Sequence, residues 1–280
     1  MLEQFNGQPA DRFENDSSRG APPGEQIAPV PDSEELRELR TWRNVYGAAS
    51  KASDWALAHR WDKSDRPYAV ADELRAKLLL CPDDFVLEVG SGSGAMLALV
   101  LRDGQRGVGL DQCEELVRRA PDFGVDAARL RLGVADASRL PIRSESVDKV
   151  LSYSVFQCFP SIEYTRRVLV EMLRVCRPGG VIVIGDVRGV MEKQAQFLES
   201  LGLSRKIADA LLLPFAPIWR LRQHTRSRGD GLRRRVFRRA FFRKALERYP
   251  CNVEFLRQET PGRPYMKLRY DIRITKRSDP

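Results

Sequence analysis

Short apolar runs alternate with helix-periodic segments through the middle of the chain. The first run is Phe85-Val86-Leu87-Glu88-Val89-Gly90, and comparable runs cover residues 107–111, 130–135, 147–153 and 181–185. A run of this length with no polar alternation is typical of a strand that is buried on both faces of a sheet. Helical spacing separates several of these runs, over residues 91–102, 114–120 and 162–176. Strands that alternate with helices predict an α/β domain with a doubly wound, mostly parallel sheet.

The two ends of the chain have different patterns from this central region. Residues 1–31 are rich in Gly, Pro and polar residues and poor in large apolar side chains, so we expect a disordered tail. Apolar residues recur at helical spacing over residues 32–66, which predicts an N-terminal helical region. Residues 67–280 then form the main domain, which opens with a further helix. Its last strand-like pieces, residues 253–256 and 268–275, predict an antiparallel hairpin.

Composition narrows the class of protein. The chain has 280 residues, of which 42% are hydrophobic, with a net charge of +9, so it can bury the core of one large domain and favours anionic partners. It has no run of about 20 apolar residues, and residues 1–5 do not begin a secretory signal, so we expect a cytoplasmic protein. The five cysteines are scattered without a C-x-x-C pair or a His cluster. This pattern predicts free thiols and no metal site.

A glycine loop follows the first predicted strand. Gly90, Gly92 and Gly94 allow a tight turn and let a ligand approach bare backbone at the start of a helix. Asp111 ends the second strand, where an acid can hold two ribose hydroxyls, and Asp136 ends the third, where an acid can accept from an exocyclic amine. With Ala95 the loop also satisfies a dinucleotide-binding pattern, so a dehydrogenase stays open at this point.

Four segments in order resemble the motifs of class I S-adenosylmethionine-dependent methyltransferases. They are residues 86–94, 107–111, 135–150 and 173–180, and the resemblance covers roughly residues 68–187. It implies a seven-stranded Rossmann-like sheet with a C-terminal antiparallel hairpin. It also implies that residues 32–66 form a helical lid, that residues 188–250 form a helical insert between strands five and six that builds the substrate cap, and that S-adenosyl-L-methionine is the cofactor.

The resemblance also implies a role for each matching residue. The methionine moiety would face a set that belongs to the first strand and the loop after it: Glu88, Gly90, Ser91, Gly92 and Gly94. Asp111 would hold the ribose and Gln112 would flank the adenine. Asp136 and Ala137 would read the adenine edge. Ser152 and Tyr153, at the end of strand four, would lie near the methionine amine or the transferred methyl. Asp148 lies at the opposite end of that strand, so we expect it to be structural.

The acceptor side departs from the family pattern. Small-molecule members often carry one or two His after strand four, where this chain has Val155-Phe156-Gln157-Cys158-Phe159. The candidates for catalysis are therefore His59 in the lid, Asp186 after strand five and Tyr153. His59 has the alternative of a surface or packing role. Gln157 and Arg188 are the expected substrate-binding residues, with Arg188 as an anchor for an anionic acceptor. The aromatic residues of the lid (Trp42, Tyr46, Trp55 and Trp61) either cover the cofactor or pack the lid onto the sheet.

The insert is strongly basic. Residues 220–248 contain twelve Arg or Lys and two acids, and residues 232–245 have the spacing of a basic amphipathic helix. This helix could present a solvated face packed by its apolar stripe, contact an anionic membrane surface, or bind nucleic-acid phosphates. The leading interpretation is methyl transfer to an oxygen or nitrogen of a small-molecule or lipid-like metabolite. The alternatives are an RNA methyltransferase and a non-catalytic cofactor-binding regulatory protein.

Overall fold

The fold described here is that of a computed structural model of the chain. It describes six stretches, residues 33–49, 66–102, 105–119, 128–190, 234–261 and 268–278. The expected disordered tail, His59, Trp55 and Trp61 of the lid, and residues 191–233 of the basic insert lie outside the described residues. Expectations for these parts therefore stay predictions.

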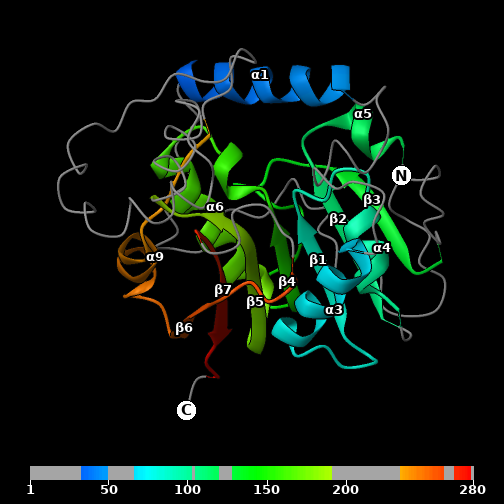
Figure 1. Cartoon of the computed structure of the whole chain (residues 1–280), viewed down its shortest axis with the longest axis vertical. Helices are drawn as coiled ribbons and strands as arrows, with labels where there is room; N and C mark the ends of the chain where they lie inside the picture. Colours follow the sequence, from blue (N-terminus) through cyan, green and yellow to red (C-terminus); the bar gives the residue numbers. More distant parts are fainter. Residues whose placement is uncertain are drawn as a thin grey trace.

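One mixed sheet forms the centre of the described part of the chain (Figure 1). Its strands are β1 (Phe85–Val89), β2 (Arg106–Asp111), β3 (Leu130–Val134), β4 (Val147–Tyr153), β5 (Cys176–Arg188), β6 (Cys251–Leu256) and β7 (Arg269–Lys276). The order is β3-β2-β1-β4-β5-β7-β6. The first five strands pair in parallel, whereas β7 is antiparallel to both β5 and β6. The predicted seven-stranded, mostly parallel sheet with a C-terminal hairpin is confirmed.

Helices cover both faces of this sheet. The helices of the described residues are α1 (Ser33–Ala49), α3 (Arg66–Leu78), α4 (Ala95–Val100), α5 (Glu114–Val117), the 3-10 turn η3 (Phe156–Cys158), α6 (Ile162–Val175) and α9 (Arg239–Leu246). Helices α3 and α4 share one apolar cluster, while α6 and α9 belong to another on the opposite face. Figure 1 shows α1 lying across one end of the sheet. This helix begins one residue after the predicted start of the lid.

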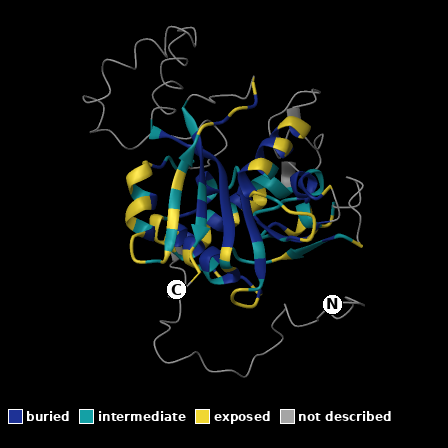
Figure 2. Ribbon diagram, turned by 90° about the horizontal axis from the view of Figure 1, so that it is seen from below, coloured by how far each residue is buried: buried dark blue, intermediate teal, exposed yellow. Residues whose placement is uncertain are grey.

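The central strands alternate their side chains between these two clusters. Leu151 of β4 and Val183 of β5 contact the α3 side, whereas Val150 and Ile182 contact the α6 side. All four are completely buried, as are most residues of the inner strands in Figure 2. Full burial of such a side chain stabilises the fold by about 1.5–3 kcal/mol. Burial on both faces explains why these strands appear in the sequence as continuous apolar runs.

Strand β5 differs most from its predicted extent. It was expected over residues 181–185, yet its pairing begins at Cys176, opposite Val147, and continues to Arg188. Its register with β7 shifts between Ile184 and Val187. Asp186 lies inside this bulge with φ +62°, a left-handed conformation that is uncommon for a residue other than glycine. A bulge turns side chains away from their regular alternation, which the sequence pattern alone did not indicate.

The described end of the basic insert packs its apolar stripe into the core. Phe242 and Leu246 of α9 are buried, while Arg239, Arg243 and Lys244 are exposed. The guanidinium of Arg243 lies 5.2 Å from the ring centroid of Phe255 on β6. A buried apolar stripe with an exposed basic face is compatible with all three alternatives for this helix, which therefore stay predictions. Among the described residues there is also no helix with the length and apolarity needed to span a membrane.

Candidate active site

A cavity of about 1090 Å³, including the space open to solvent, lies at the carboxyl ends of the parallel strands. Its walls come from the loops after β1, β2, β3 and β4, and α1 contributes Leu39, Trp42 and Tyr46. Ligands of open α/β sheets bind outside these strand ends, where the strand order reverses. Here the reversal falls between β1 and β4, because β1 is followed along the chain by β2 on its other side.

The glycine loop forms one wall of the cavity. Gly90, Gly92 and Gly94 have φ of +78°, +56° and +79°, respectively. A Cβ atom on Gly90 would lie 2.5 Å from a methyl carbon of Val155, so this position lacks room for a side chain as well. The predicted tight turn is therefore confirmed in conformation. Gly90 and Gly92 line the cavity, whereas Gly94 packs against Leu132.

Asp111 connects the end of β2 to this loop. Its Oδ2 accepts a hydrogen bond from the amide of Gly92 at 2.8 Å, and its Oδ1 accepts from the amide of Cys113 at 2.8 Å. The side chain also lines the cavity, as does the neighbouring Gln112. Burial raises the pKa of Asp111 above its usual value, although these hydrogen bonds counteract the rise. Asp111 thus holds the shape of the loop, which the sequence did not indicate.

Glu88 is a buried acid on the floor of the cavity. It is 2% exposed, and its Oε2 has no hydrogen-bond partner among the described residues. Burial, and then the nearby Asp111, raise the pKa of Glu88 well above its usual value. Ser91, which also lines the cavity, has a buried Oγ without a partner in the described part of the chain. Because unpartnered buried polar groups are costly, the Glu88 oxygen indicates a place for a hydrogen-bond donor of a ligand.

Asp136 acts on the cavity through its neighbours. Its Oδ1 accepts hydrogen bonds from the amide and hydroxyl of Ser138, each at 2.7 Å, and from the hydroxyl of Tyr164 at 2.8 Å. Burial and the carboxylate of Asp136 raise the pKa of that tyrosine. Tyr164, Ala135 and the predicted Ala137 line the cavity, whereas Asp136 itself does not.

The residues at the carboxyl ends of β4 and β5, and those that follow β4, form a cavity wall and a buried layer behind it. Tyr153 lines the cavity as expected, and so does Ser154. Ser152, Gln157, Asp186 and Arg188 are buried and do not belong to the lining formed by the described residues. Gln157 Nε2 donates to the hydroxyl of Ser154 at 3.0 Å, and this hydroxyl donates to Asp186 Oδ2 at 2.9 Å. The structure therefore brings Asp186 and Gln157 together on Ser154.

Residues that the sequence did not single out complete the lining. Cys158 lies in the segment that follows β4, and burial raises the pKa of its thiol to about 12. Phe159 and Ser154 also line the cavity. Their place directly after strand four was the available signal, because that segment was already expected to face the acceptor. Within the described residues, no group of His, Cys, Asp or Glu could hold a metal ion.

Helix α1 is fixed over the cavity by charged contacts. Arg167 of α6 donates to Glu35 Oε2 at 2.6 Å, and Ser161 also bonds to Glu35. Trp42 is 2% exposed and stacks on Tyr46 with ring centroids 5.6 Å apart. The guanidinium of Arg234 lies 5.6 Å from the ring of Trp42. Trp42 and Tyr46 therefore both help to pack α1 and cover the cavity. The sequence offered these two roles as alternatives, and the two residues combine them.

Comparison with known proteins identifies this architecture. Residues 87–184 match the family model described as a methyltransferase domain. The chain is 34% identical over 130 residues to phosphatidylethanolamine N-methyltransferase of Cereibacter sphaeroides, which covers 42% of this chain and 61% of that protein. It is 32% identical over 103 residues to the probable human tRNA methyltransferase 9B, covering 37% and 21%. The chain thus spans less than two thirds of these relatives.

A solved structure shares the fold over most of the chain. It is the 1,6-didemethyltoxoflavin N1-methyltransferase of Burkholderia thailandensis with bound 1,6-didemethyltoxoflavin and S-adenosylhomocysteine, with a TM-score of 0.56. Sequence identity is 16%, and the match covers 90% of this chain and 93% of that one. The domain match and the strand order, together with the glycine loop between Glu88 and Asp111, show that residues 87–184 form a methyltransferase domain of the class I S-adenosylmethionine-dependent type.

Proposed function

We propose that this protein moves the methyl group of S-adenosylmethionine to an oxygen or nitrogen atom of a small-molecule or lipid-like acceptor. The observation that carries the proposal is the single cavity that unites the glycine loop and Glu88 with the residues after β4. A cofactor held at the loop would direct its reactive end toward Tyr153 and Ser154. The acceptor would then occupy the space between these residues and α1.

The residues present fit the cofactor. The unpartnered Oε2 of Glu88 suits the ammonium group of the methionine moiety, and Ser91 Oγ offers a further hydrogen bond. The Asp111 carboxylate accepts backbone amides, among them those of Gly92 and Cys113, and its remaining lone pairs suit a ribose hydroxyl. Asp136 would act by fixing Ala137 and Tyr164 beside the adenine. Gln112 lines the same part of the cavity.

The chain's own contribution to catalysis is alignment and exclusion of water. Bound S-adenosylmethionine supplies a methyl group that is already reactive because its sulfur is positively charged. The protein has to hold the acceptor in line with that methyl group, and Trp42 and Tyr46 cover the cavity from the side of α1. Asp186 would reach the acceptor's proton only through Ser154, since it lies behind the wall. His59 remains a further candidate outside the described residues.

Arginine side chains in and near the cavity wall favour an anionic acceptor. Arg188 and Arg234 both act electrostatically on the thiol of Cys158, where they lower its pKa against the effect of burial. Arg43 and Arg119 line the cavity itself. A phosphate or carboxylate elsewhere on the acceptor would be attracted to this side of the site. We therefore keep Arg188 as an anchor that acts from just behind the wall.

The test is a calorimetric titration with S-adenosylhomocysteine, with NADH as the control. We expect micromolar binding of S-adenosylhomocysteine and none of NADH. Transfer of a radiolabelled methyl group to small amines, hydroxyl compounds and lipids then tests turnover. Binding of S-adenosylhomocysteine without methyl transfer to any of these acceptors would favour a non-catalytic regulatory protein. Binding of NADH alone would move the protein to hydride chemistry and overturn the proposal.

RNA is the second candidate acceptor. The similarity to a probable tRNA methyltransferase and the exposed basic side of α9 both favour it. Phosphate contacts would make such binding fall steeply with salt. The same radiolabel assay on total RNA, at low and high salt, separates this candidate from small acceptors. Salt-dependent pelleting with anionic liposomes would instead indicate membrane contact through residues 220–248.

A further inference from the structure

Ser154 has an unusual backbone conformation at the wall of the cavity. It follows β4 directly, lines the cavity and has φ +60°. Its amide donates to the carbonyl of Gly185 at 3.0 Å, which ties the end of β4 to β5. A residue other than glycine keeps such a strained backbone conformation only where its surroundings hold it, and residues of this kind cluster at functional sites. The side chain of Ser154 is therefore placed by its neighbours rather than by its own preference.

The partners of the Ser154 hydroxyl fix the direction of its hydrogen bonds. Ser154 Oγ donates a hydrogen bond to Asp186 Oδ2, with 2.9 Å between the two oxygens. Gln157 Nε2 donates to the same hydroxyl at 3.0 Å and also to the main-chain carbonyl of Ser154, and this carbonyl fixes the orientation of the amide. A hydroxyl has one proton and two lone pairs. After these two contacts the hydroxyl keeps one lone pair, and Ser154 belongs to the cavity wall.

Asp186 is held as a hydrogen-bond acceptor by its other partners. Arg269 Nη1 lies 2.6 Å from its Oδ2, and Gln258 Nε2 donates to its Oδ1 at 3.0 Å. Its own amide donates to Asp271 Oδ1 at 2.8 Å, which stabilises the bulge of β5. A carboxylate that faces a guanidinium and an amide only accepts. Asp186 therefore accepts a hydrogen bond from the Ser154 hydroxyl and donates none to it.

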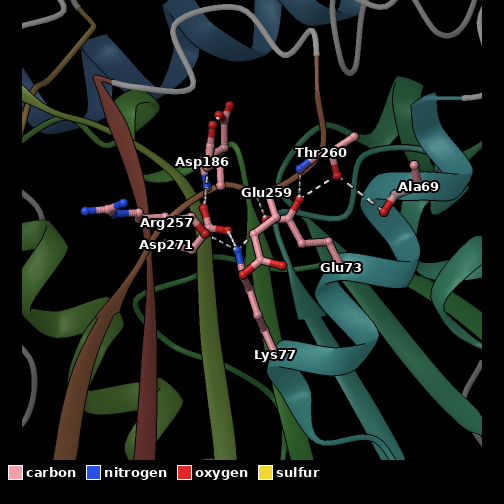
Figure 3. Close-up of polar contacts among 9 residues, drawn as sticks. Ala69, Glu73, Lys77, Asp186, Arg257, Glu259, Thr260 and Asp271 are labelled. Atoms are coloured by element: carbon pink, nitrogen blue, oxygen red, sulfur yellow. Dashed lines mark hydrogen bonds and ion pairs between the residues drawn. The ribbon is translucent and has the colours of Figure 1, made fainter.

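A buried network fixes this arrangement from the far side (Figure 3). Lys77 of α3 donates to Asp271 Oδ2 at 2.6 Å and to the carbonyl of Arg257 at 2.7 Å. Glu73 of α3 bonds to Lys77 and accepts from the amide of Thr260 at 2.9 Å. Asp271 is completely buried. Lys77 of α3 and Gln258, whose Nε2 donates to Asp271 Oδ1 at 3.2 Å, thus hold Asp271 and through it the backbone of Asp186.

We propose that Ser154 determines which acceptors the site takes, because its hydroxyl is presented to the cavity as a hydrogen-bond acceptor. The bound acceptor would carry an O–H or N–H donor at this point, as an alcohol, phenol or amine does. A carboxylate or other oxyanion would meet a lone pair there and be rejected. Asp186 and Gln157 are positioning residues that act through Ser154. This inference rests on the proposed methyl transfer and narrows its acceptor class.

The test uses three small probes with the wild-type protein saturated with S-adenosylhomocysteine. Phenol offers a donor, fluorobenzene has nearly the same size without one, and benzoate carries an oxyanion. Binding is measured by ligand-observed NMR titration. One hydrogen bond predicts a preference for phenol over fluorobenzene of about fivefold. Because Arg43 and Arg119 attract any carboxylate to the cavity, benzoate is compared only between wild type and the variants. Equal binding of phenol and fluorobenzene, or no measurable binding of phenol, would overturn the proposal.

Variants locate the preference at Ser154. In Ser154→Ala the preference for phenol should disappear, while affinity for S-adenosylhomocysteine changes less than about twofold. Ser154→Gly is the second variant, because glycine adopts φ +60° without strain. Ser146→Ala is the matched control, since that exposed hydroxyl bonds only to the carbonyl of Arg143 among the described residues. A preference that persists in both Ser154 variants would exclude Ser154 as its origin.

The Asp186→Asn variant tests whether Asp186 orients the Ser154 hydroxyl or only stabilises the fold. The introduced amide can donate to Ser154 and turn the hydroxyl proton toward the cavity. The preference should then shift from phenol toward benzoate, which loss of stability alone would not cause. Unchanged probe preference in a folded Asp186→Asn variant would show that Asp186 does not set the direction. Failure of wild type to bind S-adenosylhomocysteine would instead refute the proposed function, so the two failures are distinguishable.

Discussion

The carboxylate of Asp111 holds the amide of Gly92 at 2.8 Å, across the gap between the ends of β2 and β1. The same side chain lines the cavity. One acid therefore both shapes the glycine loop and faces the ligand. Substitution of Asp111 should therefore weaken cofactor binding more than substitution of an acid that only holds a backbone amide elsewhere in the sheet.

Asp111→Asn should weaken binding of S-adenosylhomocysteine about 10- to 150-fold. This range corresponds to one charge-assisted hydrogen bond of about 1.5–3 kcal/mol. Asp148→Asn is the matched control, because Asp148 Oδ2 also accepts a backbone amide, that of Phe85 at 2.8 Å, at the other end of the sheet. Calorimetry should show near wild-type affinity for that control. Equal losses in both variants would contradict a direct role for Asp111.

Cofactor affinity should rise with pH because of Glu88. Burial and then Asp111 raise the pKa of Glu88 well above 4.5, so the empty site holds a protonated acid over a wider range. The positive charges of S-adenosylmethionine favour the ionised form. Binding therefore strengthens as pH rises through the raised pKa, whereas the stability of the ligand-free protein falls over the same interval. Titrations at several pH values measure this, and a similarly steep profile in Glu88→Gln would refute the assignment.

Gly90→Ala should destabilise the protein more than Gly92→Ala. Both positions have positive φ, which costs about 1 kcal/mol or more for alanine. At Gly90 the new Cβ would also lie 2.5 Å from Val155, whereas at Gly92 the nearest atom is a Leu116 methyl at 3.7 Å. The overlap adds about 1–3 kcal/mol. Urea unfolding measures the difference, and Val155→Ala should restore part of the loss only in the Gly90→Ala background.

Glu73→Gln should lower the free energy of unfolding by about 3 kcal/mol at pH 7. It removes one partner of a buried ion pair with Lys77. Burial opposes the charge of Glu73, yet hydrogen bonds from Lys77 and Thr260 lower its pKa to about 2. The stability it contributes is therefore complete above pH 4.5 and lost as pH falls toward 2. Wild type should lose more stability than Glu73→Gln over that interval.

The control for this prediction is an exposed ion pair. Glu114 pairs with Arg118 at 2.6 Å on the surface of α5, where both side chains are more than half exposed. Glu114→Gln should cost less than about 1 kcal/mol, since solvent screens such pairs. If Glu73→Gln cost no more than Glu114→Gln in urea unfolding, the buried network would not stabilise the fold as described.

Local sequence was sufficient for the framework of the cofactor site. Burial of β1 and β2 on both faces requires continuous apolar runs, and the turn after β1 requires glycine at positive φ. Glu88, Gly90 and Asp111 could be located because they lie at the ends of these runs. The parallel arrangement then brings them to one edge of the sheet. Asp136 lies two residues beyond the end of β3 and behind the cavity lining, and its contact with Tyr164, 28 residues further on, has no local sequence signal.

The acceptor side depended on contacts between distant parts of the chain. A strand five that ends at residue 185 predicts Asp186 and Arg188 on the cavity wall, but β5 extends to Arg188 and contains both. The bulge against β7 instead turns Asp186 toward Ser154, Gln258 and Arg269. Likewise, the contact of Glu35 with Arg167 spans 132 positions. Such pairings have no local period to reveal them.

The sequence by itself thus determined the order of strands and helices, the glycine turn and the acids at the strand ends. Each of these follows from the conformational limits or burial of neighbouring residues. Only the tertiary structure decided how α1 covers the cavity and which way the hydroxyl of Ser154 points. The physical reason is that a buried polar group must find its partner wherever the packed chain supplies one, and Asp186 is supplied by a strand that lies 32 residues further along the chain.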